Sequence, residues 1–254
     1  MSGILLCGCN GKMGRAVTMS VADTEGCEIV CGVDVYDEIK YGYPVFTSPA
    51  LIDKTTAEKI DAIIDFSNPA GLAGLLEFAV ANSIPAVICT TGLNEAQINL
   101  IKSASTKIPV FFSANMSLGV NLVCELAKKA AKVLGNSFDI EIVEMHHNQK
   151  IDAPSGTALM IADSIKEELN DDIIYEYDRH SKREKRTKKE IGIHAVRGGT
   201  ITGEHEVIFA GHDEIIKISH SARSKELFAT GAVNAANFII GKPAGLYNMT
   251  DMLK

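Results

Sequence analysis

The sequence lacks the long apolar runs that would carry it into a membrane. None of its 254 residues lies in an uninterrupted apolar stretch of about 18 residues, the length that a spanning helix needs. Residues 1–6 also lack the basic region and the processing site of a secretory signal, and they are typical of a first buried strand. We therefore expect no membrane association and a location in the cytoplasm.

A cysteine framework is missing as well. The six cysteines show no paired spacing, and most lie in apolar runs such as residues 86–89, where a thiol behaves as a small buried hydrophobe. Reduced structural thiols are therefore favoured over disulfides. A zinc site is disfavoured too, because neither an HExxH pattern nor a cysteine partner accompanies the adjacent histidines His146 and His147. We expect no metal.

The sequence also lacks an excess of positive charge. Its 25 Lys and Arg against 32 Asp and Glu give a formal net charge of −7. This balance argues against general nucleic-acid binding. Residues 179–189 are locally basic, yet no aromatic side chains that could stack on bases are interleaved with the charges. We favour a solvated loop or a frayed helix for this run. The alternative is a segment that attracts an anionic substrate or cofactor.

What the sequence does contain, in its first part, is an alternation of apolar strand-like runs with helical segments. Such alternation is typical of βαβ units and a parallel sheet. We expect strands at residues 3–7, 27–34, 61–66, 84–90 and 108–114, and helices at 12–22, 70–82 and 95–103.

The pattern changes after residue 117. Two strands flanking the turn at residues 211–213 fit an antiparallel or mixed sheet. We therefore expect an α/β domain of residues 1–117 plus 223–254, to which the last helix returns, and an α+β domain of residues 118–222. The expected elements are helices at 118–134, 155–169 and 225–240, and strands at 138–145, 191–197, 204–209 and 214–220.

A glycine-rich motif connects the first strand to the first helix. Gly8, Gly11 and Gly14 form a GxxGxxG variant of the dinucleotide fingerprint, in which the backbone turns tightly and approaches a pyrophosphate. Asp34 follows 20 residues after Gly14, at the end of the second strand, where ribose hydroxyls would lie. Strand, helix and acid in this order make a Rossmann-type parallel-sheet domain that binds a dinucleotide the favoured interpretation.

Two further loops follow expected strands of the same sheet: Thr90, Thr91 and Gly92, and then residues 113–116. Ligands of open parallel sheets bind at the carboxyl ends of the strands. Ordinary βα turns explain these loops equally well from the sequence alone.

The densest polar cluster spans residues 144–158, between a strand and a helix start. Ser155, Gly156 and Thr157 can offer amides and hydroxyls to a carboxylate or phosphate there. Lys150 adds a cation, and His146 can exchange a proton near neutral pH. The alternatives are that Ser155 only caps the helix and that His147 is a satisfied core residue.

The glycine motif and the segment His146-His147-Asn148-Gln149-Lys150-Ile151-Asp152-Ala153-Pro154-Ser155-Gly156-Thr157 together resemble the paired signature of the dihydrodipicolinate reductase family. The likeness covers nearly the whole chain, because residues 90–92, 113–117, 196–199 and 203–205 also fall in family order. It implies NAD(P)H-dependent reduction of a cyclic imine dicarboxylate, 4-hydroxy-tetrahydrodipicolinate (dihydrodipicolinate), to tetrahydrodipicolinate in the diaminopimelate route to lysine.

The resemblance also implies roles for individual residues. His146 would be the acid/base, with Lys150 as proton donor or polarising cation; His147, Ser155, Gly156 and Thr157 would bind substrate. The α+β domain would bind substrate and form the oligomer, a homotetramer. The cofactor residues would be Gly8, Cys9, Asn10, Gly11, Lys12, Met13, Asp34, Thr90, Thr91, Gly92, Ser113, Ala114, Asn115 and Met116.

The sequence departs from the family at two positions, with Met116 where Phe is frequent and Val35 where Arg is frequent. Without that arginine, Asp34 favours NADH, although Lys12 could still reach the 2′-phosphate of NADPH. Another two-domain dehydrogenase would have no reason to contain the segment 146–157. A non-catalytic nucleotide-sensing protein is the other alternative, and the intact His146 and Lys150 count against it.

Overall fold

The computed structural model describes residues 1–169 and 172–253, and these form two compact units. Unit 1 consists of residues 1–116 and 226–254, and unit 2 of residues 117–225. The expected domain boundaries, 1–117 plus 223–254 and 118–222, differ from these by at most three residues. The chain therefore crosses between the units twice, and its last segment belongs with its first.

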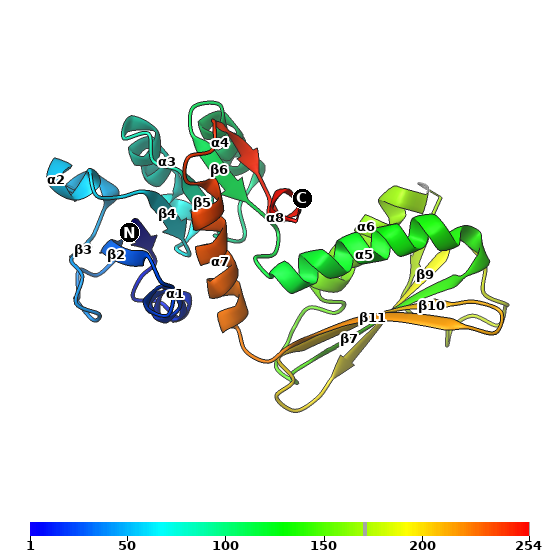
Figure 1. The fold of residues 1–254 in the computed structure, drawn as a ribbon. Helices are drawn as coiled ribbons and strands as arrows, with labels where there is room; N and C mark the ends of the chain where they lie inside the picture. Colours follow the sequence, from blue (N-terminus) through cyan, green and yellow to red (C-terminus); the bar gives the residue numbers. More distant parts are fainter. Residues whose placement is uncertain (170–171, 254) are drawn as a thin grey trace. The chain divides into compact units, whose positions relative to one another are not determined.

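Unit 1 is built on a seven-stranded sheet in the order β12-β6-β5-β4-β1-β2-β3, and every neighbouring pair is parallel. Helices cover both of its faces (Figure 1). The expected Rossmann-type sheet is confirmed. Its elements are β1 (Ser2–Cys7), α1 (Lys12–Ala22), β2 (Cys27–Val33), β3 (Val45–Phe46), η1 (Pro49–Leu51), α2 (Lys54–Ala57), β4 (Ala62–Asp65), η2 (Pro69–Gly71), α3 (Leu72–Ala81), β5 (Ala86–Ile88), α4 (Glu95–Ser105), β6 (Pro109–Phe112), α7 (Glu226–Ile239), β12 (Gly245–Tyr247) and α8 (Met249–Met252).

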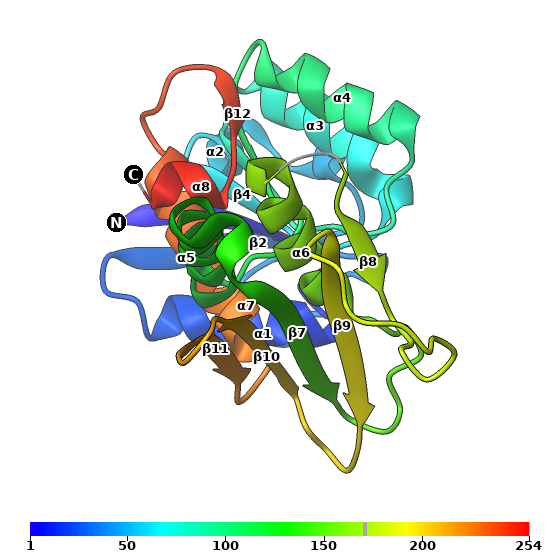
Figure 2. The same ribbon diagram turned by 90° about the vertical axis from the view of Figure 1, so that its right-hand side faces the viewer.

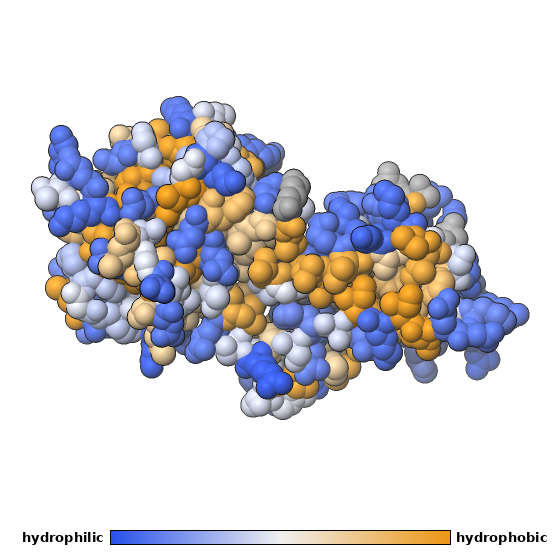
Figure 3. Space-filling model, in the orientation of Figure 1, coloured by the Kyte–Doolittle hydropathy of each residue, from blue (hydrophilic) through white to orange (hydrophobic). Residues whose placement is uncertain are grey.

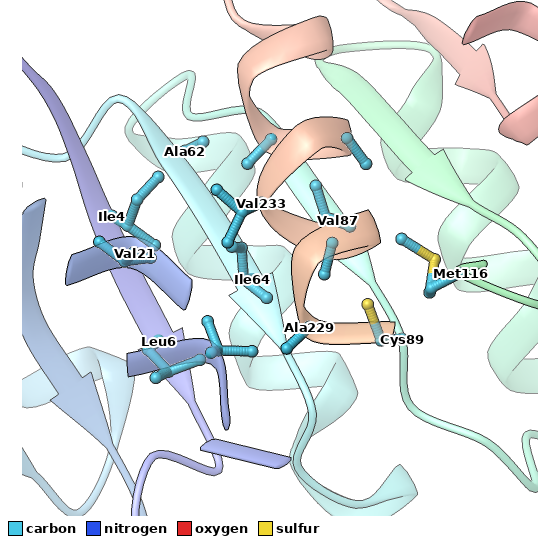
Figure 4. Packing of buried hydrophobic residues seen from close by; sticks show 14 of the residues in the cluster. Ile4, Leu6, Val21, Ala62, Ile64, Val87, Cys89, Met116, Ala229 and Val233 are labelled. Atoms are coloured by element: carbon cyan, nitrogen blue, oxygen red, sulfur yellow. The ribbon is translucent and has the colours of Figure 1, made fainter. Parts of the chain in front are cut away.

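Helix α7 supplies one of the two core layers of unit 1. Successive residues of β1 point to opposite faces of the sheet, so Ile4 belongs to one apolar cluster and Leu5 to the other. On the Ile4 side, Ala229 and Val233 of α7 pack among side chains from β1, β4, β5 and α1 (Figure 4). The small alanines of this helix let it approach the sheet closely, which explains why the last part of the chain returns to unit 1.

The sequence did not predict the short elements of unit 1, namely β3, α2, β12 and α8. Strand β3 has two residues and β12 has three, so neither carries enough alternation of apolar and polar residues to be recognised. Both are edge strands, and each pairs with a single neighbour. Their positions are therefore decided by pairing with β2 and β6 rather than by local pattern.

Unit 2 contains a five-stranded sheet in the order β11-β10-β7-β9-β8, with antiparallel pairs at β11-β10-β7 and parallel pairs at β7-β9-β8. The expected mixed sheet is confirmed. Helices α5 and α6 lie against one face of it (Figure 2). The elements are α5 (Leu118–Leu134), η3 (Gly135–Ser137), β7 (Asp139–His146), α6 (Gly156–Leu169), β8 (Ile174–Glu176), β9 (Glu190–Arg197), β10 (Gly203–Ala210) and β11 (Ile215–Ala222).

The apolar residues of α5 point in two directions. Val123, Cys124 and Ala127 are buried with the core of unit 2, whereas Leu122 and Leu126 are 45% and 44% exposed. Figure 3 shows the resulting apolar strip along this helix. One apolar face of α5 therefore packs against the sheet of unit 2, and a second apolar row lies outside that core.

The basic run at residues 179–189 is a largely exposed loop, as expected, but several of its cations pair with acids of the sheet. Arg186 donates to Asp139 at 3.1 Å and to Glu141 at 2.9 Å, and Arg179 pairs with the buried Glu190. These cations neutralise acids at the β7, β8 and β9 end of the sheet. The same pairing argues against the alternative in which this run attracts an anionic ligand. The other pairs are Lys182–Glu176, Lys188–Asp139 and Lys189–Asp172.

Candidate active site

The glycine motif forms a tight turn between β1 and α1. Gly8 has a φ of +76°, and a Cβ there would meet the Phe66 carbonyl oxygen at 2.5 Å. A Cβ at Gly14 would lie 2.2 Å from the Gly8 oxygen, so side chains are excluded at both positions. Helix α1 begins without a side-chain cap. The turn thus presents backbone and a helix N-terminus, which suit a pyrophosphate.

Asp34 is bound to this turn. One carboxylate oxygen accepts from the Asn10 amide at 2.9 Å, and the other accepts from the Val35 amide at 2.8 Å. A cavity of about 640 Å³ is lined here by Gly8, Asn10, Gly11 and Asp34 together with Lys40. The cavity fits the ribose and phosphate end of a dinucleotide, with a carboxylate ready to accept from ribose hydroxyls.

A second cavity of about 610 Å³ lies at the ends of β5 and β6. It shares two lining residues, Phe66 and Ser67, with the first cavity, so the two form neighbouring parts of one crevice at the carboxyl edge of the sheet. Its lining includes Met13, Thr90, Thr91, Gly92, Ser113, Ala114, Asn115 and Met116. The two loops therefore do more than turn the chain: they line the crevice.

Asp65 lies at the end of β4 and fixes the residues around it. Its fully buried carboxylate accepts from the Ser67 hydroxyl at 2.6 Å and the Thr90 hydroxyl at 2.7 Å. Burial raises the pKa of Asp65, and the bonds from Ser67 and Thr90 counteract only part of that rise. One carboxylate thus joins the ends of β4 and β5, where both cavities are lined.

In unit 2, the polar residues at the end of β7 continue a row of core isoleucines. Ile140, Ile142, Glu144 and His146 alternate on the buried face of the strand. The Nδ1 atom of His146 lies 2.6 Å from Oε2 of Glu144. Glu144 is completely buried, so this imidazole is held from inside the unit.

Two groups besides His146 contact the Glu144 carboxylate. Arg197 donates to both of its oxygens, at 2.8 and 2.7 Å, and the Ser155 amide donates at 3.0 Å. Burial would raise the pKa of Glu144, but the hydrogen bonds from Arg197, His146 and Ser155 together hold it below its ordinary value. The carboxylate is therefore ionised at neutral pH.

Ser155 is buried, and its hydroxyl has two partners within the protein. The oxygen accepts from the Ala158 amide at 3.1 Å, which caps α6, and it lies 2.9 Å from Nε2 of His205. Burial, and then the nearby His146, lower the pKa of His205 to about 4. His205 is thus neutral at neutral pH. The Ser155 hydroxyl holds the start of α6 and the ring of His205 from a buried position.

The loop between β7 and α6 carries the remaining predicted residues. Lys150 lies 2.8 Å from Asp152, and that bond lowers the pKa of the Asp152 carboxyl. His147 is half-buried, while Gly156 is exposed at the first position of α6 with Thr157 beside it. A cation therefore lies on the loop that joins His146, at the end of β7, to the start of α6, an arrangement suited to a carboxylate.

Two family models match the chain. The description of the first is dihydrodipicolinate reductase, N-terminus, over residues 2–116, and that of the second is dihydrodipicolinate reductase, C-terminus, over residues 119–253. The chain belongs to the dihydrodipicolinate reductase family. Members of this family are NAD(P)H-dependent oxidoreductases, and the predicted resemblance is confirmed.

Relatives in this family cover nearly the whole chain. The 4-hydroxy-tetrahydrodipicolinate reductase of Clostridium tetani is 49% identical over 98% of this chain and 96% of its own length. The enzyme of the same name from Caldanaerobacter subterraneus is 51% identical over 99% of this chain and 98% of its own.

Solved structures with a similar fold include a member of the same family. Dipicolinate-bound dihydrodipicolinate reductase from Paenisporosarcina sp. TG-14 has a TM-score of 0.80 at 25% identity and covers 98% of this chain and 97% of its own. A probable dehydrogenase from Thermotoga maritima shares the fold alone, with a TM-score of 0.63 at 11% identity over 98% of this chain and 92% of its own.

In this chain, two residues of the predicted cofactor set do not line the crevice. Cys9 is buried with its sulfur against β2, and Lys12 is exposed at the start of α1. Sequence reasoning missed Lys40, Phe66 and Ser67, which do line it. Phe66 ends the expected strand at residues 61–66 and Ser67 follows it, so the position of ligands at the carboxyl ends of parallel strands also predicts these two residues.

Glu144, Arg197 and His205 were also missed as members of the site. In the strand register, His205 of β10 lies opposite Glu144 of β7, and Arg197 of β9 lies opposite His146 of β7.

Among the described residues, no cluster of three metal-ligating side chains is present, and no helix is long and apolar enough to cross a membrane.

Proposed function

We propose that this chain reduces 4-hydroxy-tetrahydrodipicolinate (dihydrodipicolinate) to tetrahydrodipicolinate, with NAD(P)H as the hydride source, in the diaminopimelate route to lysine. The observation that carries the proposal is the pair of Glu144 and His146 at the end of β7, from which one loop holds Lys150 and leads to the start of α6. The curated relatives that share this chain's full length bear the name of that activity.

The substrate is a dicarboxylate, and unit 2 offers it a matching set of groups. Lys150 and the start of α6 at Gly156 and Thr157 would hold a carboxylate, and His147 would contact the substrate. Ser155 would act through its backbone and its cap rather than by direct contact. The structure of the Paenisporosarcina enzyme is named as dipicolinate-bound, which supports a planar dicarboxylate as ligand of this family.

His146 would protonate the reduced intermediate. Hydride addition to a ring leaves electron density that needs a proton, and an imidazole can deliver one near neutral pH. The nicotinamide, when bound, supplies the hydride. The crevice residues Thr90–Gly92 and Ser113–Met116 would hold its ring, and Gly8, Gly11 and Asp34 the other end.

For the cofactor we propose a preference for NADH, with NADPH usable. The Asp34 carboxylate lines the ribose end of the crevice and would repel a 2′-phosphate. The cation available there is Lys40, which lines the same cavity and lies 3.3 Å from Glu38. Lys12 does not line it, so Lys40 replaces Lys12 as the side chain that would make NADPH acceptable.

For the assembly we propose a homotetramer, located in the cytoplasm. The sheet of unit 2 has helices on one face only, and its other face carries Val196 and Ile215, which are 43% and 63% exposed. Such a face fits contacts with a second copy. Light scattering should give four times the chain mass of 27.3 kDa.

The test is oxidation of NADH or NADPH, followed by absorbance, with the product mixture of a dihydrodipicolinate synthase as substrate. We expect rapid oxidation by the wild-type enzyme. His146→Gln should lower kcat at least ~10²-fold while cofactor affinity stays near wild type. No oxidation by the wild type would favour a nucleotide-sensing protein, and a variant within a few-fold of wild type would refute the role of His146.

A further inference from the structure

We propose that Glu144 is a positioning residue for the reaction: it holds His146 with a proton on Nδ1, so that Nε2 is the atom that exchanges protons with the substrate. The proposal rests on the proposed function, in which His146 is the acid. Glu144 itself would not touch the substrate, because its carboxylate is completely buried.

The contacts of Glu144 determine which atom of His146 carries the proton. Both carboxylate oxygens accept from the Arg197 guanidinium, one accepts from the Ser155 amide, and Nδ1 of His146 lies 2.6 Å away. An ionised carboxylate has no proton to donate, so the short bond requires Nδ1 to be the donor. In neutral His146, Nε2 is therefore unprotonated.

Gly203 keeps the other nitrogen accessible. This glycine opens β10 beside the end of β7, and a Cβ there would lie 3.0 Å from Nε2 of His146. A side chain at this position would push the imidazole out of place. Glu144 therefore binds the Nδ1 side of the ring, and the absence of a side chain at position 203 leaves space beside Nε2.

The same carboxylate fixes the loop that carries the other groups. The Ser155 amide binds Glu144, and Nη2 of Arg197 bridges Glu144 and the Asp152 carbonyl. The end of β7, the residues just before α6 and the end of β9 thus converge on one side chain. A purely structural role would consist of holding this loop alone, so a test has to separate loop order from imidazole protonation.

Glu141 provides a matched control on the same strand. It accepts from Arg186 at 2.9 Å and lies 2.8 Å from His194, so it also joins an arginine to a histidine. It lies on the opposite face of β7 and is partly exposed. Glu141→Gln removes a carboxylate that joins an arginine to a histidine without touching His146.

The first measurement needs no variant. In ¹⁵N-labelled wild-type enzyme at a pH where His146 is neutral, the ¹⁵N shifts should identify Nδ1 as the protonated nitrogen, with His146→Gln supplying the assignment. A protonated Nε2 and bare Nδ1 would overturn the proposal. Because the wild type is used, the result does not depend on whether any Glu144 variant folds.

The second measurement is a double-mutant cycle in kcat. Glu144→Gln should lower kcat about 10²-fold, change the Kd of pyridine-2,6-dicarboxylate by less than about threefold, and have little effect in the His146→Gln background. Glu141→Gln should stay within about threefold, as partly exposed pairs contribute little. An equal loss in both backgrounds, or a kcat unchanged by Glu144→Gln, would refute positioning through His146.

The two hypotheses fail in different ways. If His146→Gln itself keeps its activity, the proposed acid is wrong and the positioning role falls with it. If His146→Gln is inactive but Glu144→Gln is fully active, the proposed function stands and only the role of Glu144 is refuted.

Discussion

Two buried carboxylates, Asp65 and Glu144, lie at the carboxyl ends of β4 and β7, one in each unit. A buried charge is costly unless hydrogen bonds compensate it. Hydroxyl and amide donors surround Asp65, whereas Glu144 has a guanidinium, so the pKa of Asp65 is raised by burial and that of Glu144 is lowered despite burial. Through these hydrogen bonds, each carboxylate connects segments that line a proposed ligand site.

At the residue scale, we expect Lys150 to contribute directly to anion binding. Lys150→Ala should weaken binding of pyridine-2,6-dicarboxylate about 10- to 100-fold, because a charged hydrogen bond contributes about 1.5–3 kcal/mol. Isothermal titration measures the affinity. Lys189→Ala is the control, since Lys189 also pairs with an aspartate, Asp172, at 2.9 Å. Equal affinities for Lys150→Ala and wild type would place the carboxylate elsewhere.

Cofactor preference is also decided by single side chains. Asp34→Ala with Val35→Arg should shift the ratio of kcat/KM toward NADPH, because a repulsion is removed and a guanidinium is added. Lys40→Ala should lower kcat/KM for NADPH more than for NADH, since Lys40 lines the ribose end of the crevice. A wild-type enzyme that clearly prefers NADPH would refute the argument from Asp34.

At the element scale, the register of the mixed sheet makes unit 2 sensitive to acid. His205 lies opposite Glu144 on β10, and its pKa is lowered from 6.5 to about 4, chiefly by burial. Below pH 6.5 the unfolded chain takes up a proton that the folded chain accepts only near pH 4. The stability from neutral His205 is therefore complete above pH 6.5 and falls between 6.5 and 4, by up to about 3 kcal/mol.

Thermal unfolding midpoints at pH 7 and pH 5 measure this effect. The wild-type midpoint should fall more on acidification than that of His205→Gln, whose amide can still bond Ser155 but does not titrate. His212→Gln serves as control, because His212 is fully exposed on the turn between β10 and β11 and should leave the pH dependence unchanged. If His205→Gln has the same pH dependence as wild type, His205 is not the titrating group.

At the scale of the whole molecule, the chain order and the folded units do not coincide. The two family models divide the chain at residue 116, yet α7, which lies within the second match, packs into unit 1. Ala229 and Val233 of this helix are buried against the parallel sheet (Figure 4). Without residues 226–254, that face of the sheet would expose its apolar side chains to water.

Fragments test this division. Residues 1–116 alone should fail to fold or should aggregate, whereas residues 1–116 joined by about six Gly/Ser residues to 226–254 should fold and bind NADH. A short linker suffices because a Cβ on Gly231 of α7 would lie only 1.7 Å from the Met116 oxygen. Circular dichroism and NADH fluorescence report the outcome, and a folded, NADH-binding 1–116 fragment would contradict the expectation.

The sequence by itself determined the features that depend on neighbouring residues. Apolar runs bounded by turns predicted the main strands and helices, and the glycine motif followed by Asp34 located one end of the crevice. The segment 146–157 identified the family. These signals are local, because side-chain periodicity and backbone conformation act over a few residues.

Only the tertiary structure decided which distant residues complete the site. Glu144 meets Arg197, 53 positions away, and Ser155 meets His205, 50 positions away, through a strand register that no local pattern specifies. Lys40 reaches the crevice from a stretch outside every expected element, and the basic run at 179–189 proved to pair with sheet acids. Such contacts depend on the register of the paired strands and on the packing of the helices against the sheets. Register and packing are set by apolar contacts and hydrogen bonds over the whole unit, not by a few neighbouring residues.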